Sequence, residues 1–205
     1  MLRQRCFGTL QMVFCFVLVG LSAGFATMVQ TGSRDHGFVW IANGVLLAYL
    51  LTAPRWRWKY IAIASYLAMW VGGSLSGGDW RGNLVYALLD VGEALLSAHL
   101  LRRRSTEFPN FTDPAYLARF AGIALVLSPL LASLADALFS RWAFHVSVLR
   151  ALPDWAIGDA LGTAIATPAS VAIIRNGLGA WKTVRHPWIY PALLAAATLL
   201  CFSNA

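Results

Sequence analysis

The sequence predicts an all-α protein that crosses a membrane repeatedly, as a polytopic transmembrane bundle of about seven helices with a cytoplasmic N-terminus. The composition, the length of the apolar runs and the positions of the basic residues all favour this fold class. Of the 205 residues, 59% are hydrophobic and only 12% are charged. Because a soluble domain is roughly half apolar and about a quarter charged, this chain has too little polar surface to cover a soluble core of its size.

The predicted spans are runs of mainly apolar residues, and a helix needs about 20 of these to cross the hydrocarbon core. They lie at residues 6–28, 38–53, 58–75, 83–101, 115–140, 155–174 and 188–202. The first run is longer than the apolar core of a secretory signal, so we expect it to remain as the first helix. No connector is long enough to fold separately, and residues 1–205 are therefore predicted to form one integral-membrane domain.

The basic residues orient this bundle. With the N-terminus inside, twelve of the sixteen Lys and Arg residues fall on the cytoplasmic side, which is the excess typical of cytoplasmic loops. The net charge of +7 is then a signal of topology and of attraction to anionic lipid head groups, and no nucleic-acid partner is predicted. Seven spans would leave Ala205 outside.

Four acidic residues lie inside predicted spans, namely Asp90, Glu93, Asp136 and Asp159. A charged side chain at the membrane centre costs about 2.5 to 3.5 kcal/mol on insertion scales, so each acid needs a structural or functional reason. With a rise of about 1.5 Å per helical residue, Asp90, Asp136 and Asp159 fall in the outer half of the bilayer. Asn43 of the second span falls at the same level.

Polar residues on three of the spans recur every three or four positions, which places them on one face of each helix. These stripes are Asn83, Tyr86, Asp90, Glu93 and Ser97, then Ser133, Asp136 and Ser140, and finally Asp159 and Thr163. Such faces are expected to point toward protein or water rather than lipid. The predicted ligand-binding pocket is formed by Asn43, Tyr86, Asp90, Glu93, Asp136, Asp159 and Thr163.

Two interpretations of this cluster stay open at this point. The functional one is an acid-rich pocket, open to the outside, that holds a cation, a protonated amine or a titrating proton. The structural one is that the acids are neutral, or paired with Asn43, with serines and with one another, and only fix helix packing. Polar contacts between membrane helices are worth about 0.6 to 2 kcal/mol, which is enough for that purpose.

Catalytic and metal-binding patterns are missing from the sequence. The histidines, His36, His99, His145 and His186, lie at membrane edges or in connectors, and no H-E-x-x-H spacing occurs. The cysteines, Cys6, Cys15 and Cys201, show no paired spacing and are expected to be small core residues. We therefore predict no catalytic residue, no metal, no cofactor and no enzymatic activity.

Small residues and prolines indicate how the spans pack. Gly158 and Gly162 form a small-x-x-x-small pair, which lets another helix approach closely. Pro129 and Pro168 lie inside spans and are expected to kink them, because proline cannot donate the helical hydrogen bond.

The sixth span carries a family signature. Residues 155–162 read W-A-I-G-D-A-L-G and are followed by Thr167 and Pro168. This pattern resembles the tryptophan, glycine-aspartate, glycine and threonine-proline signature of the first family of membrane-associated sensor domains (MASE type 1).

Two other spans are similar to the same family, so that the resemblance covers about residues 38–174. The second span, with residues 40–45 and 54–57, resembles the family's tryptophan-proline stretch and basic-aromatic connector, but has Ile41 and Ala42 where prolines are common. The fourth span resembles a family helix that ends in leucines and arginines, with a glutamate that corresponds to Glu93.

The resemblance implies a bacterial inner-membrane input module, usually of about eight helices, that is joined to a diguanylate cyclase, phosphodiesterase or histidine kinase. It also implies a last helix and an output domain beyond this chain, as expected for a fragment, a frameshifted product or a partner subunit. The expected partners are the lipid bilayer, a small ligand or cation, and a cytoplasmic output domain or partner protein. A homodimer is one further option.

Three functions compete on this basis. A sensor would bind a ligand from outside and shift helix packing, which requires different affinities for the two packings. A small-solute or cation transporter subunit would use the acids as a relay, but the sequence shows no inverted repeat. A membrane enzyme would need a nucleophile and a base in reach of each other, and the sequence places none together.

Overall fold

The computed structural model describes residues 13, 15–28, 39–103 and 108–177. The chain divides into one unit of residues 1–171 and a second of residues 172–205, of which only residues 172–177 are described. All contacts discussed below lie within the first unit.

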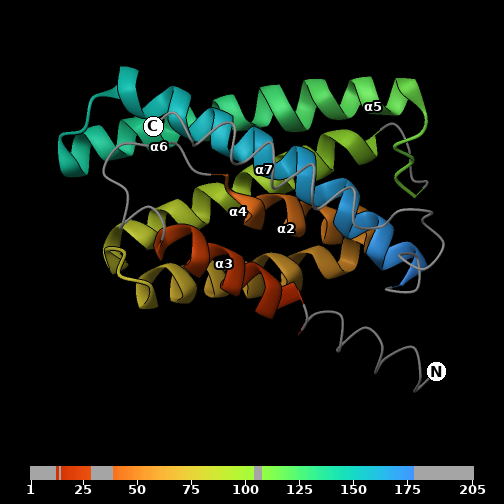
Figure 1. The fold of residues 1–205 in the computed structure, drawn as a ribbon, viewed down its shortest axis with the longest axis horizontal. Helices are drawn as coiled ribbons and strands as arrows, with labels where there is room; N and C mark the ends of the chain where they lie inside the picture. The colour runs from red at the N-terminus through yellow and green to blue at the C-terminus, as the bar shows by residue number, and fades with distance from the viewer. Residues whose placement is uncertain (1–12, 14, 29–38, 104–107, 178–205) are drawn as a thin grey trace, which may run out of the picture. The chain divides into compact units, whose positions relative to one another are not determined.

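Every regular element in the described part of the chain is a helix, which confirms the predicted all-α fold class (Figure 1). The elements are an N-terminal helix (Cys15–Met28), α2 (Ile41–Thr52), the 3-10 turn η1 (Arg55–Arg57), α3 (Trp58–Leu75), α4 (Trp80–Arg103), α5 (Pro114–Phe120), the π-helical segment η2 (Ala121–Leu127), α6 (Ser128–Phe144) and α7 (Val148–Asn176). Because α5, η2 and α6 follow one another without a break, the first six predicted spans each correspond to one helical segment. The seventh, at residues 188–202, lies outside the described residues.

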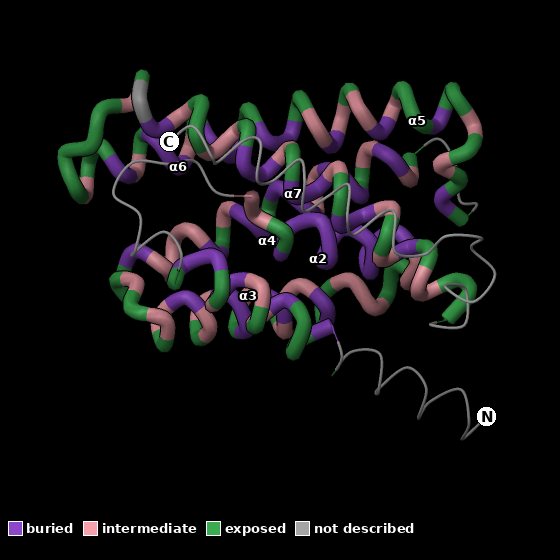
Figure 2. Tube along the Cα trace, viewed as in Figure 1, coloured by how far each residue is buried: buried purple, intermediate pink, exposed green. Residues whose placement is uncertain are grey.

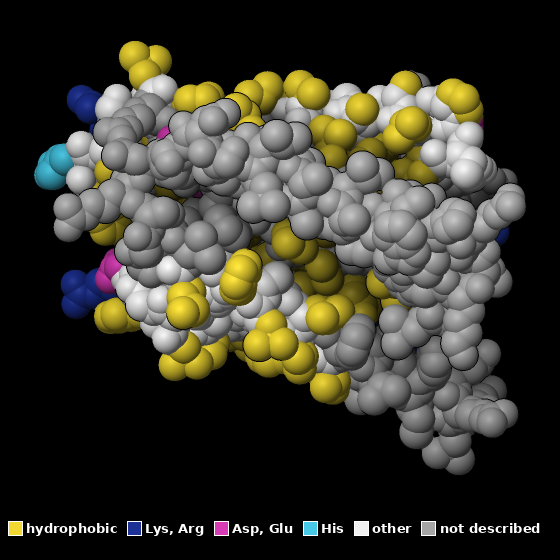
Figure 3. All heavy atoms as spheres, viewed as in Figure 1, with side chains coloured by type: hydrophobic (Ala, Val, Ile, Leu, Met, Phe, Trp, Pro, Cys, Tyr) yellow, Lys and Arg dark blue, Asp and Glu magenta, His cyan; other side chains and the backbone are white. Residues whose placement is uncertain are grey.

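The long helices have the length and composition of membrane spans. Trp80–Arg103, Pro114–Phe144 and Ala151–Asn176 are each long and apolar enough to cross a bilayer, whereas Cys15–Met28 and Ile41–Thr52 are shorter apolar helices. On the face that Figure 3 shows, hydrophobic side chains cover the described helix flanks, and charged side chains gather toward the ends of the helices. This distribution fits a protein whose flanks contact lipid.

The helix α7 begins earlier than predicted, at Val148 rather than at residue 155. The interval between the predicted spans 115–140 and 155–174 was expected to be a connector and includes Pro153, yet Pro153 lies inside the helix. The hydrogen bond that its ring cannot donate would have reached the carbonyl of Leu149, which is 89% exposed and lies in the first turn. A proline this close to a helix start is therefore tolerated.

Pro129 changes the helix type of the fifth predicted span rather than ending it. The seven residues before α6, Ala121–Leu127, form a π-helix, and Pro129 occupies the first turn of α6. Proline leaves the carbonyl four positions earlier without its donor, and a π-helical turn is one of the known ways to accommodate such a break. The span thus has an irregular segment next to the polar stripe of Ser133 and Asp136.

The short helix α2 is the buried centre of this unit. Ten of its twelve residues, from Ala42 to Leu51, are buried, and Figure 2 shows it buried along most of its length. It packs against α3 and α4, while α4 also packs against α3 and α6. Because α2 is surrounded by protein, its one strongly polar side chain, Asn43, must find its partners inside the bundle.

The helices α2 and α7 approach at backbone distance. The amide of Trp40 donates to the carbonyl of Gly158 (3.1 Å), and the carbonyl of Trp40 lies where a side chain on Gly162 would have to go. One helical turn along α2, the hydroxyl of Thr167 donates to the carbonyl of Gly44 (3.0 Å). The small-x-x-x-small pair and the threonine-proline step of the sixth predicted span therefore both serve to hold α2.

We expect Thr167→Val, which keeps the shape but removes this hydroxyl, to lower the free energy of unfolding by about 1 kcal/mol, since polar contacts between membrane helices have this size. Thr52→Val is the matched control, because Thr52 bonds only the carbonyls of its own helix. Unfolding the purified protein with SDS and following circular dichroism measures both values. Equal losses for the two variants would show that the bond between α7 and α2 contributes nothing specific.

Candidate ligand-binding site

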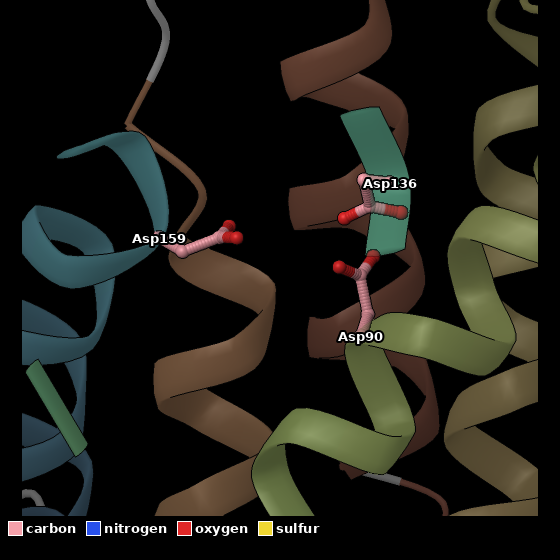
Figure 4. A group of neighbouring side chains, drawn as sticks. All are labelled: Asp90, Asp136 and Asp159. Atoms are coloured by element: carbon pink, nitrogen blue, oxygen red, sulfur yellow. The ribbon is translucent and has the colours of Figure 1, made fainter. Parts of the chain in front are cut away.

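The structure brings together the acidic residues of α4, α6 and α7. One carboxylate oxygen each of Asp90, Asp136 and Asp159 lies within 4.8 Å of the others. Figure 4 shows the three side chains pointing toward one another from separate helices. These three residues and Glu93 are all at most 7% exposed. The polar stripes predicted on three spans thus face one interior position.

Asn43 joins α2 to this cluster. Its side-chain amide donates to Glu93 Oε2 at 3.0 Å and to Asp90 Oδ1 at 3.5 Å. Both acceptors belong to α4, and Asn43 lies in the first turn of α2. These hydrogen bonds therefore fix the position of the start of α2 relative to the acids. Asn43 is therefore the only predicted site residue seen to donate hydrogen bonds to two of the acids.

Tyr86 connects the cluster to the aromatic residues around it. Its hydroxyl lies 2.6 Å from the Ser140 hydroxyl of α6. Its ring makes edge-to-face contacts with Phe139 of α6 and Trp155 of α7, with ring centroids 5.4 Å apart in both pairs. A single side chain of α4 therefore contacts both other helices that carry an aspartate of the cluster.

A cavity of about 240 Å³ leads to the three aspartates. It is lined by Thr27, Trp40, Met69, Gly73, Gly78, Asp79, Asn83, Tyr86, Ala87, Asp90, Asp136, Trp155 and Asp159. The residues at one end, such as the exposed Asp79, belong to the turn between α3 and α4, whereas Asp90 at the other end is buried. In the predicted orientation that turn lies on the outer side of the membrane.

The predicted pocket residues take three different positions. Tyr86, Asp90, Asp136 and Asp159 line the cavity. Asn43 and Glu93 are buried behind it, joined to each other and to Asp90 by the amide described above. Thr163 is not a wall residue of the cavity; it is buried beside Gly44 in the contact between α2 and α7.

Sequence reasoning missed several wall residues. Trp40 and Trp155 were not predicted to line the pocket, although Trp155 stands one helical turn before Asp159 and so shares its face. Asp79 was assigned to a connector. Helical spacing could have identified Trp155, but nothing in the sequence pairs Thr27 of the N-terminal helix with this site.

The described walls of the cavity supply no positive charge to the acids at its base. Among the described residues that line the cavity, none is Lys, Arg or His. Asp136 Oδ1 and Asn43 Oδ1 are buried and have no hydrogen-bond partner. Carboxylates this close in a medium of low dielectric repel one another strongly unless protons or a bound cation neutralise them. The arrangement is therefore suited to accept positive charge from outside the protein.

Fold and site together define a membrane-embedded helical domain with a cavity that leads to buried acidic residues. The model of the MASE1 family matches residues 9–204, nearly the whole chain. The chain belongs to this family of membrane-associated sensor domains, which confirms the resemblance seen in the sixth span. No curated protein and no solved structure matches it significantly.

Proposed function

We propose that this sensory input module detects a small cation that enters the cavity from the outer side of a bacterial inner membrane. The signal would pass to a cytoplasmic output of the cyclic-di-GMP or kinase type, in a partner protein or in a further domain. The observation that carries the proposal is the meeting of Asp90, Asp136 and Asp159, from three helices, at the base of one cavity. The chain itself would perform no catalytic step.

Neutralisation of the three carboxylates supplies the conformational signal in this proposal. Without a cation, negative charges on the aspartates of α4, α6 and α7 repel one another, because their oxygens lie within 4.8 Å of each other. A bound cation reverses the sign of that interaction and favours a closer packing of the same helices. The ligand then binds the two packings with different affinity, which is the condition for any ligand-driven shift.

The helices α2 and α4 offer a route from the cavity to the opposite end of the bundle. Near the cavity, Asn43 joins them through Asp90 and Glu93. At the far end, the guanidinium of Arg102 donates to the carbonyls of Leu50 and Ala53, which end α2. Because α2 and α4 are linked at both ends, a displacement of α4 at the acids would be transmitted to this second contact.

A panel of external cations tests the proposal on the purified full chain in lipid nanodiscs. Na⁺, K⁺, Mg²⁺, Ca²⁺ and n-butylammonium are added, and hydrogen exchange is followed at the far ends of α2 and α4. We expect at least one of these cations to change exchange at residues 50–57 and 99–103, and Asp136→Asn to abolish the change. Uptake of the bound cation into proteoliposomes would instead show a transporter, and binding without any change at these residues would contradict sensing.

We expect Arg102→Ala to remove the contact between α4 and the far end of α2 while leaving the cavity in place. The substitution deletes the donors to Leu50 and Ala53 as well as the cation–π contact with Trp58, whose ring centroid lies 5.7 Å from the guanidinium carbon. Exchange at residues 50–53 should rise at least tenfold and lose its dependence on the cation. Arg103→Ala, one residue along and exposed, is the control and should behave as the unaltered protein. A cation response that survives in Arg102→Ala would rule out this route.

A further inference from the structure

The cavity is larger and more apolar than a site for a bare ion. Its volume is about 240 Å³, whereas a site for one water-sized particle needs only about 10 to 15 Å³ on a comparable measure. Between the exposed turn and the aspartates, its walls are built by Trp40, Met69, Tyr86, Ala87 and Trp155. Pockets that combine mainly apolar walls with a few convergent polar groups usually hold organic ligands.

The base of the cavity matches the hydrogen-bonding pattern of a primary ammonium group. Such a group has three N–H donors and no acceptor. Donors at tetrahedral angles with hydrogen bonds of about 2.8 Å hold their acceptors about 4.6 Å apart. The oxygens of Asp90, Asp136 and Asp159 lie within 4.8 Å of one another, and Asp136 Oδ1 is buried without a partner.

The aromatic walls suit the remainder of such a ligand. Trp40, Tyr86 and Trp155 are among the residues that line the cavity together with the aspartates, and aromatic rings attract organic ammonium groups as well as alkyl chains. Mg²⁺ and Ca²⁺ take six or more oxygen ligands at about 2.0 to 2.6 Å. The apolar walls add none to the carboxylate oxygens of the three aspartates.

We infer that the cavity binds a small aliphatic primary amine in its protonated form, with the ammonium group between Asp90, Asp136 and Asp159 and the carbon chain against Trp40, Tyr86 and Trp155. This inference rests on the proposed function and specifies its ligand class. It uses the buried acids as acceptors of hydrogen bonds, and it assigns the aromatic residues to the selection of an organic cation over an inorganic one.

Isothermal titration calorimetry on the full chain, in nanodiscs of zwitterionic lipid, separates these ligand classes. The probes are n-butylammonium, the uncharged butan-1-ol, n-butyltrimethylammonium without N–H donors, and Mg²⁺ or Ca²⁺. We expect saturable binding of n-butylammonium, no saturable binding of butan-1-ol, and at least tenfold weaker binding of the trimethylated cation. The alcohol corrects for partition of the alkyl chain into lipid.

Variants tie the binding to the aspartates. Asp136→Asn should weaken n-butylammonium binding at least tenfold, while Asp154→Asn, which changes an exposed acid of α7, the helix that carries Asp159, should change it less than twofold. Should Asp136→Asn not elute as a folded species, Asp159→Asn takes its place with the same expectation. If metal ions bind and Asp136→Asn weakens their binding, while n-butylammonium does not bind, the proposal of an amine ligand is wrong. The proposal of cation sensing would then still hold. Absence of binding by every cation would overturn both proposals.

Discussion

Replacing Gly162 by alanine is expected to lower the free energy of unfolding by about 2 to 3 kcal/mol, the upper part of the range of about 1 to 3 kcal/mol for an added group in a packed core that must move its neighbours. A methyl group at this position would meet the carbonyl carbon and oxygen of Trp40 and the amide of Ile41. All three are backbone atoms of the segment that starts α2, so none can rotate away. The first turn of α2 would have to separate from α7.

Gly92→Ala is the matched control for this substitution. Gly92 also lies inside a membrane-length helix, α4, but an added methyl group there meets no atom within 4 Å. The free energy of unfolding of Gly92→Ala should stay within about 0.5 kcal/mol of that of the unaltered protein, as for surface substitutions in general. SDS unfolding of the two variants in parallel gives both values. If the losses are equal, the close approach of α2 and α7 is not what makes Gly162 important.

Much of the fold could be predicted because a membrane span is recognisable from the composition and length of its apolar run. Runs of apolar residues predicted six helical segments, and residues that interrupt helices marked the connections between them. Gly77 is one of these residues, and it has a φ of +97° in the turn between α3 and α4. The ends of the segments were harder to place. Pro153 lies in the second turn of α7, and the carbonyl that it leaves without a donor belongs to the exposed Leu149 of the first turn, so Pro153 gave a false boundary for α7.

The candidate site was predictable as far as helical periodicity reaches. Spacings of three and four put Asp90 with Glu93, Ser133 with Asp136, and Asp159 with Thr163 on common faces, and the structure turns each face inward. Periodicity within one helix cannot say which residues of different helices touch. Thr27 and Trp40 therefore entered the site only through the packing of their helices around α4 and α7.

The close contact between α2 and α7 and the hydrogen bonds of Asn43 to the acids of α4 depend on each other. Trp40 is held against α7 by the hydrogen bond to Gly158, and Asn43 follows it by three residues in the first turn of α2. A helix pushed away from Gly162 would carry Asn43 away from Asp90 and Glu93. The small residues of α7 thus set the distance at which a polar side chain of α2 reaches the acids of α4.

Replacing Asn43 by aspartate should be the most damaging change to the acid cluster. The side chain keeps its shape, but both donors to Asp90 and Glu93 are lost and a fifth carboxyl group is added beside them. Hydrogen bonds to charged groups are worth about 1.5 to 3 kcal/mol each, so we expect a loss of about 3 to 5 kcal/mol in the free energy of unfolding. SDS unfolding, together with the yield of folded protein after extraction, measures this loss.

Asn110→Asp makes the same chemical change where the surroundings differ. Asn110 is exposed in the connector before α5, and its side-chain oxygen accepts from the amide and hydroxyl of Thr112, a role that a carboxylate retains. Its stability should therefore hardly change. If Asn43→Asp is as stable as Asn110→Asp, the amide of Asn43 is not needed to hold the acids together. The cluster would then be stabilised by protons shared among the carboxyl groups, and α2 would have no direct part in sensing the charge at the base of the cavity.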